Sequence, residues 1–97
     1  MKHEYLKVAG KTDEGKLVMS GVGTLCFTAG VPLELILHHF REHNLVVDWL
    51  DYIQTALKDG HKPNTIQSRM EAALGDVYGK AYTEEVMKRA KALFTQG

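Results

Sequence analysis

The sequence predicts a small, mainly α-helical fold: a bundle of four or five short helices, with or without a short N-terminal β-hairpin. A length of 97 residues indicates one domain over residues 1–97. From residue 20 onward, apolar side chains recur at every third or fourth position, which is the period of an amphipathic helix. Apolar residues make up 44% and charged residues 25% of the chain, the balance of a folded globular protein.

The beginning of the chain, residues 5–20, is compatible with two structures. Apolar residues alternate with others over 6–9, and a second apolar run over 17–19 follows a polar turn, which predicts a β-hairpin. A helix with Thr12 as its N-cap is the alternative, because two acidic residues follow Thr12. Two glycines in the segment disfavour a long helix. Residues 1–19 are therefore expected to be irregular or a hairpin, before a helical core over 20–97.

Two short helices are predicted next. Ser20 is a candidate N-cap for the first, which ends at Gly30. Pro32 opens the second, because a first-turn residue needs no N–H, and Asn44 can end it in a left-handed conformation. Their inner faces are expected to carry Val22, Leu25, Cys26 and Ala29 in the first helix, and Leu33, Ile36, Leu37 and Phe40 in the second.

Three further helices complete the prediction. One begins at Asp48 and stops at Gly60, the next begins with the capping pair Asn64 and Gln67 and ends at Gly79, and Thr83 caps the last. Their expected inner residues are Trp49, Leu50, Ile53, Ala56 and Leu57; Ile66, Met70, Ala73, Leu74 and Val77; and Val86, Met87, Ala90, Leu93 and Phe94.

The segment 20–43 has the layout of a helix-turn-helix, with Gly30 in the turn and Val31 as the apolar residue after it. It resembles the helix-turn-helix DNA-binding proteins. The resemblance implies that the helix from Pro32 to His43 enters the major groove, so that Pro32, Leu33, Glu34, Leu37, His38 and Arg41 face DNA. Leu33 and Leu37, however, also belong to an apolar stripe, and their burial would remove the groove-reading helix and favour protein binding.

Two functions are therefore predicted. The first is a small transcription regulator that binds DNA as a homodimer, through a local patch because the net charge is zero. Its DNA contacts would come from Pro32, Glu34, His38, Arg41, Lys62 and Arg69. The dimer interface would use Leu35, which lies opposite the apolar stripe, and Tyr52 at a half-exposed rim. The second is a protein-binding adaptor or inhibitor that acts through an exposed helix face.

No residue pattern predicts an enzyme, a cofactor or a metal site. His39 and His43 lie one helical turn apart, but two imidazoles make an incomplete metal site. Gly10-Lys11-Thr12 lacks the earlier glycine and the strand of a phosphate-binding loop. A single cysteine, Cys26, cannot form an internal disulfide, and neither a signal peptide nor a membrane-spanning segment is recognised. A cytoplasmic location with no membrane partner is expected.

Overall fold

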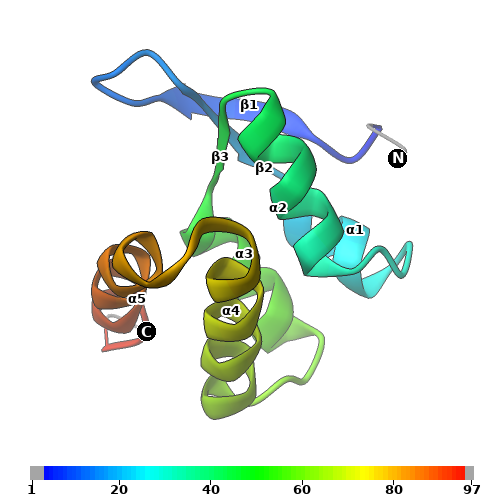
Figure 1. Ribbon diagram of the computed structural model, residues 1–97. Coiled ribbons are helices and arrows are strands. Elements are labelled where there is room, and N and C mark those ends of the chain that lie inside the picture. Colours follow the sequence, from blue (N-terminus) through cyan, green and yellow to red (C-terminus); the bar gives the residue numbers. More distant parts are fainter. Residues whose placement is uncertain (1–3, 96–97) are drawn as a thin grey trace.

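The computed structural model describes residues 4–95, and the fold is mainly helical, as predicted (Figure 1). Three strands and five helices follow one another in this part of the chain. Their order is β1 (Lys7–Lys11), β2 (Leu17–Ser20), α1 (Val22–Phe27), α2 (Leu33–Glu42), β3 (Leu45–Val47), α3 (Trp49–Lys58), α4 (Pro63–Tyr78) and α5 (Lys80–Thr95).

The first two strands form the predicted antiparallel pair, and the alternative helix beginning at Thr12 is wrong. Lys7 lies opposite Ser20 and Lys11 lies opposite Leu17, with a shift of register between Val8 and Gly10. Thr12 makes two hydrogen bonds that close the turn between the strands. Its N–H donates to the Lys16 carbonyl at 2.8 Å, and its hydroxyl accepts from the Lys16 N–H at 3.0 Å.

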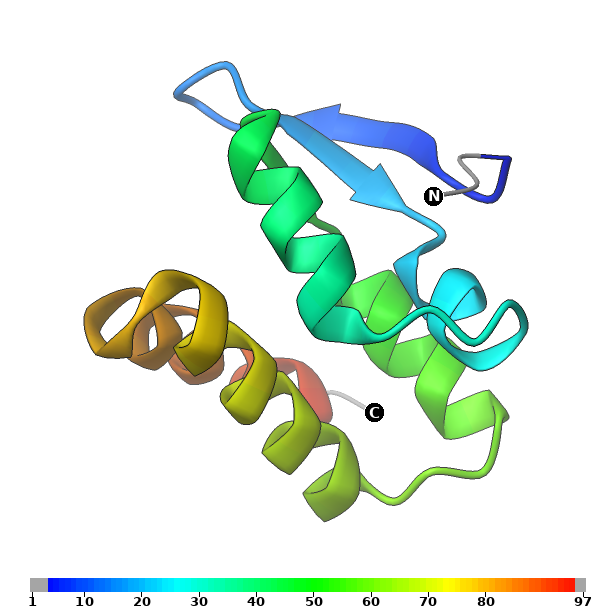
Figure 2. The same ribbon diagram turned by 45° about the vertical axis from the view of Figure 1, so that its right-hand side comes forward.

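A third strand, β3, was not predicted. It pairs with β2 in parallel, with Leu17 beside Leu45 and Met19 beside Val47, so the sheet has the order β1-β2-β3. Three residues are too few to show a strand period in the sequence. As a consequence the helices do not form a simple bundle. Helix α2 contacts β3 and α4, and the hairpin and the α4–α5 pair lie toward opposite ends of the molecule (Figures 1 and 2).

Three predicted helix starts are wrong. Ser20 ends β2 and donates its hydroxyl to the Lys7 carbonyl at 3.3 Å, while Gly21 precedes α1. Helix α4 begins at Pro63 without a side-chain cap, because proline already supplies the backbone angle of a first turn. Helix α5 begins at Lys80, and Thr83 lies inside it, buried, with its hydroxyl donating to the Gly79 carbonyl at 2.6 Å.

The other helix boundaries follow the sequence signals. The carboxylate of Asp48 accepts the Asp51 N–H at 3.2 Å and caps α3. Asn44 after α2 has the left-handed φ of 58° that its position requires. Gly79 separates α4 from α5 with φ 86°, a value that side chains rarely tolerate.

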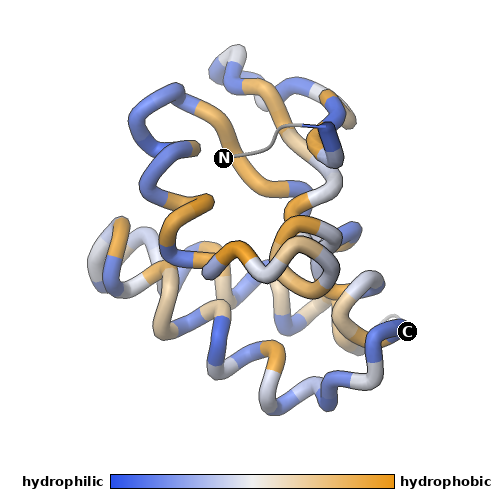
Figure 3. Tube along the Cα trace, turned by 90° about the vertical axis from the view of Figure 1, so that its right-hand side faces the viewer, coloured by the Kyte–Doolittle hydropathy of each residue, from blue (hydrophilic) through white to orange (hydrophobic). Residues whose placement is uncertain are grey.

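A single apolar core joins α1, α2, α3, α4 and α5 to β3, and most predicted inner residues lie in it. Helix α3 is rotated from the predicted orientation. Leu50 and Leu57 are each 43% exposed, whereas Tyr52 is 1% exposed, against the expected half-exposed rim. The trace in Figure 3 changes between hydrophilic and hydrophobic within single helices, as amphipathic packing elements require.

Candidate binding cleft

The predicted DNA-facing helix is α2, and the structure divides its residues into two groups. Leu33 and Leu37 are 7% and 1% exposed and belong to the core, so neither can face a groove. Pro32, Glu34, His38 and Arg41 are exposed. The apolar stripe of α2 is therefore a packing face.

The two basic side chains of this group contact helix α4. Arg41 donates through Nη1 to the Val77 carbonyl at 2.6 Å, and its guanidinium lies 5.9 Å from the centre of the Tyr78 ring. The last carbonyls of a helix lack partners inside the helix, so Arg41 satisfies one of them. His38 lies 3.9 Å from the Asp76 carboxylate. Both residues thus join α2 to the C-terminal end of α4.

The remaining predicted DNA contacts are Lys62, which directly precedes α4, and Arg69 within α4, and both are exposed. Arg69 also lines a pocket of about 230 Å³ together with Pro32 and Glu34, and Cys26 and Tyr52 line the same pocket. The structure therefore brings together three of the six predicted residues, Pro32, Glu34 and Arg69, at the turn between α1 and α2. Of the two predicted interface residues, Leu35 is 57% exposed, whereas the chain's own core covers Tyr52.

The reactive groups of this small pocket are held in their neutral forms. Burial, assisted by the charge of Glu34, raises the pKa of the Cys26 thiol from 9.0 to about 12, although Arg69 opposes the shift. Burial also raises the pKa of the Tyr52 hydroxyl. Because the thiolate is the nucleophilic form of cysteine, a raised pKa disfavours covalent chemistry at Cys26.

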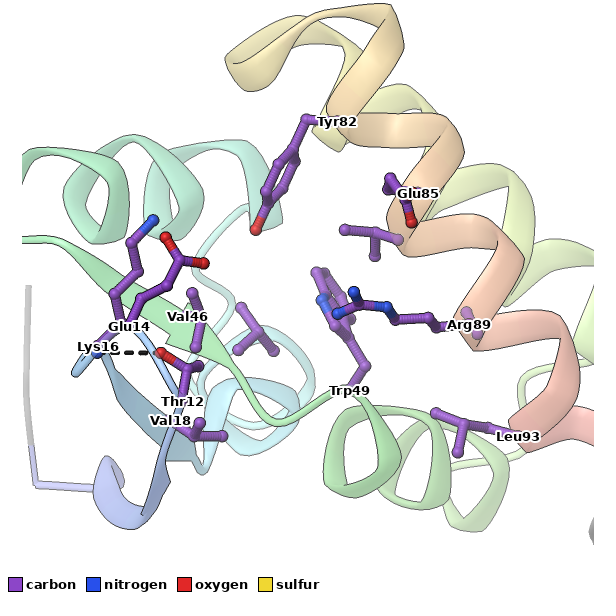
Figure 4. A pocket seen from close by; sticks show the side chains of 13 residues that line it. Thr12, Glu14, Lys16, Val18, Val46, Trp49, Tyr82, Glu85, Arg89 and Leu93 are labelled. Carbon is purple, nitrogen blue, oxygen red and sulfur yellow. Dashed lines mark hydrogen bonds between the residues drawn. The ribbon is translucent and has the colours of Figure 1, made fainter.

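A larger cleft, of about 370 Å³, lies between the hairpin, β3 and α5, and we call it the hairpin–α5 cleft (Figure 4). Its lining comes from three stretches that are distant in the sequence. These residues are Thr12, Glu14, Lys16 and Val18 of the hairpin, Val46, Val47 and Trp49 around β3, and Tyr82, Glu85, Val86, Arg89, Ala90 and Leu93 of α5.

The floor of the hairpin–α5 cleft is apolar, and the sheet register explains why. Val18 and Val46 are paired neighbours on β2 and β3, so their side chains share one face of the sheet. Trp49, at the start of α3, lies half-buried beside them and makes an edge contact with Tyr52, with ring centres 5.4 Å apart. Apolar groups in an open cleft are stabilised when a ligand or partner removes them from water.

The rim of the cleft is charged on both walls. Glu14 and Lys16 stand on the hairpin wall, and Glu85 and Arg89 project from α5 across the cleft (Figure 4). Within residues 4–95, these four side chains form no ion pair with each other or with other residues. The hydroxyl of Tyr82 points into the cleft (Figure 4), and burial, opposed by Arg89 and assisted by Glu14, raises its pKa. The rim can thus contact charged groups of either sign.

The sequence alone does not reveal this cleft. Its residues come from segments whose meeting depends on β3, which the sequence did not predict. The run Leu45-Val46-Val47, followed by Trp49, could have indicated a buried strand. All three residues of the run are apolar, and it lies between two predicted helices. The ring centres of His39 and His43 lie 4.3 Å apart, and among the described residues no cluster of three potential metal ligands occurs.

No protein-family model, curated protein or solved structure matches the chain. Within the described range, no helix has the length and apolar character needed to cross a membrane. The geometry of the hairpin–α5 cleft is therefore the basis for a candidate function.

Proposed function

We propose that the protein is a non-enzymatic protein-binding module and that it holds an apolar segment of a partner protein in the hairpin–α5 cleft. The observation that carries this proposal is an apolar floor, with Val18, Val46 and Trp49, open to solvent beneath a charged rim. An apolar centre surrounded by polar groups is the usual anatomy of a protein interface. Buried aromatic residues such as tryptophan often supply much of the binding energy.

Two further observations favour this adaptor over the DNA-binding regulator. The groove-reading helix of the regulator would have to expose Leu33 and Leu37, which are buried in the core. Arg41, its strongest cation on α2, is already engaged with the Val77 carbonyl. The raised pKa of the Cys26 thiol also disfavours the thiolate that a catalytic cysteine uses.

DNA binding is the second candidate, and one observation favours it. Lys62 and Arg69 are seven residues apart at one end of α4, both exposed, and therefore lie on the same side of that helix. Both cations would contact a phosphate backbone. This candidate predicts binding that weakens steeply with salt and that is lost in the double variant Lys62→Gln with Arg69→Gln. DNA binding that survives this double change would exclude the patch.

The single tryptophan of the chain makes the primary proposal directly testable. Random heptapeptides displayed on phage are selected on the immobilised full chain, and a selected tryptophan-free peptide is titrated while Trp49 emission is recorded. We expect a saturable change in emission. Val46→Lys should weaken binding by at least about tenfold because it places a charge on the apolar floor.

The matched control is Val8→Lys, on the outer strand β1, where the valine is 58% exposed and does not line the cleft. This variant should bind the selected peptide as the unmodified chain does. Failure to select any peptide, or equal affinities for the Val46→Lys and unmodified chains, would refute the proposed function.

A homodimer through Leu35 is a separate proposal. Leu35 is 57% exposed on α2, on the side of the helix away from the core stripe. Burying this side chain against a second copy would remove its apolar area from water. Size-exclusion chromatography with light scattering should give a dimer at tens of micromolar and a monomer for Leu35→Lys. A strict monomer for the unmodified chain at that concentration would refute it.

A further inference from the structure

We propose that the segment held in the hairpin–α5 cleft is an extended strand of the partner protein, which adds to the free edge of β3 as a fourth strand of the sheet. This inference rests on the proposed function and specifies its binding mode. It concerns backbone hydrogen bonds, whereas the proposed function requires the apolar floor alone.

The hydrogen bonds of β3 fix which of its backbone groups face outward. The Asp48 N–H donates to the Met19 carbonyl at 2.9 Å, so the backbone of Asp48 faces β2. Successive residues of a strand direct their N–H and C=O groups to alternate sides, so Val46 also faces β2. Leu45 and Val47 therefore direct their N–H and C=O groups away from β2, toward the free edge.

That edge has no backbone partner in the described part of the chain. The sheet order is β1-β2-β3, which leaves β3 paired on one side, and no hydrogen bond from residues 4–95 reaches the outward groups of Leu45 or Val47. A strand edge with free N–H and C=O groups is a template for a further strand. Peptide recognition by strand addition uses this kind of template.

The cleft reaches the free edge of β3. Val46 and Val47 are neighbours in the strand, so their side chains point to opposite faces of the sheet, and yet both residues line the cleft. Val47 is 7% exposed, so it supplies only a small part of the lining, and a cleft that touches both residues reaches an edge of the strand. Because β2 occupies the other edge, it is the free edge that opens into the cleft, opposite Tyr82 and Glu85 of α5 (Figure 4).

The dimensions and charges of the cleft describe the partner segment. Three residues of β3 extend over roughly 10 Å, at about 3.3 Å per residue, which suits a paired core of three or four residues. Alternate side chains of the added strand would lie beside Val46, where valine or isoleucine is favoured. The rim carries Glu14 and Lys16 on one wall and Glu85 and Arg89 on the other, which favours a segment with charges of both signs.

N-methylation of the selected heptapeptide tests the pairing. A strand pairs with β3 through one edge, so only every second amide of the peptide would donate to β3. Methylating these amides should weaken binding to the full chain by at least about tenfold, whereas methylating the amides between them should be tolerated. Trp49 emission reports the affinity. If methylation of the two alternate sets of amides has the same effect on binding, strand addition is wrong.

Amide hydrogen exchange of the full chain gives a second readout. Saturation with the selected peptide should slow exchange at Leu45 and Val47, whose amides face the free edge, and should change Val46 much less, because that amide already faces β2. If Val46→Lys abolishes binding but Leu45 and Val47 stay unprotected, the proposed function stands and strand addition is wrong. If no peptide is selected, both fail. Protection at Leu45 and Val47 in a dimer without peptide would identify a second copy as the occupant and overturn the proposal.

Discussion

The contact between α2 and α4 and the hairpin–α5 cleft both carry charged side chains, but they use them differently. Between α2 and α4, Arg41 donates to the Val77 carbonyl at 2.6 Å and His38 lies 3.9 Å from the Asp76 carboxylate. On the cleft rim, Lys16 and Arg89 have no ion pair within residues 4–95. The Arg41 guanidinium joins two helices and stabilises the fold, whereas charges around an open apolar floor remain available for a partner. A basic residue on a helix therefore indicates binding only where the fold leaves it unengaged.

The largest expected effect comes from adding a side chain at Gly21, where the backbone leaves no room for a Cβ. Gly21, at the junction of β2 and α1, has φ 94°, and a Cβ there would lie 1.8 Å from the Tyr5 carbonyl oxygen. Gly21→Ala should therefore lower the free energy of unfolding by more than about 2 kcal/mol, from left-handed strain and the clash together. Urea denaturation measures the loss.

Gly10→Ala is the matched control on β1. A Cβ at Gly10 would have no other atom within 4 Å, and the backbone there has no positive φ, so this change should alter stability by less than about 0.5 kcal/mol. A loss as large as that of Gly21→Ala would contradict the tight packing assigned to the β2–α1 junction and its contrast with the open hairpin.

The second effect tests the two arginines directly. Arg41→Met should lower the free energy of unfolding by about 1 kcal/mol, because it removes the bond to the Val77 carbonyl. Arg89→Met, on the cleft rim, should leave stability within about 0.5 kcal/mol but change the affinity for the selected peptide. Urea denaturation and Trp49 titration measure the two quantities, and a reversal of these roles would contradict the contrast between the two regions.

The smallest effect is a dependence of stability on alkaline pH. Burial raises the pKa of Cys26 from 9.0 to about 12 in the folded chain, so the folded state keeps a proton that the unfolded state releases. This contribution is complete below pH 9 and is lost as the pH rises from 9 toward 12. Denaturation at a series of pH values should show the decline.

Cys26→Ala should make that decline shallower and leave the part due to the tyrosines. Burial raises the pKa of Tyr78 from 10.0 to about 12 and also raises the pKa values of Tyr52 and Tyr82. Peptide binding should be unchanged by this variant below pH 9, because Cys26 does not line the hairpin–α5 cleft. An alkaline decline identical in the variant and the unmodified chain would show that the Cys26 thiol is not shielded as the structure indicates.

Local signals predicted much of the fold but none of the cleft. Asp48, Asn44 and Gly79 mark helix boundaries by their own backbone and capping preferences, and the structure follows them. The predicted orientation of α3 is wrong. Leu50 and Leu57 recur at the helical spacing of the buried residues and were expected inside, yet Tyr52 is buried and both leucines are exposed. The helical period shows which residues share an apolar face. Which side of that face is buried depends on the neighbouring elements.

The sequence by itself determined a mainly helical chain and the apolar stripe of α2, because each depends on contacts between residues close in the chain. It left residues 5–20 as either a hairpin or a helix, and the structure decided for the antiparallel strand pair. The tertiary structure alone decided that Leu45–Val47 joins the sheet in parallel with β2, and that the hairpin, β3 and α5 enclose a cleft. Parallel pairing and cleft formation join segments that are far apart in sequence, and their stability comes from burial that no local pattern encodes.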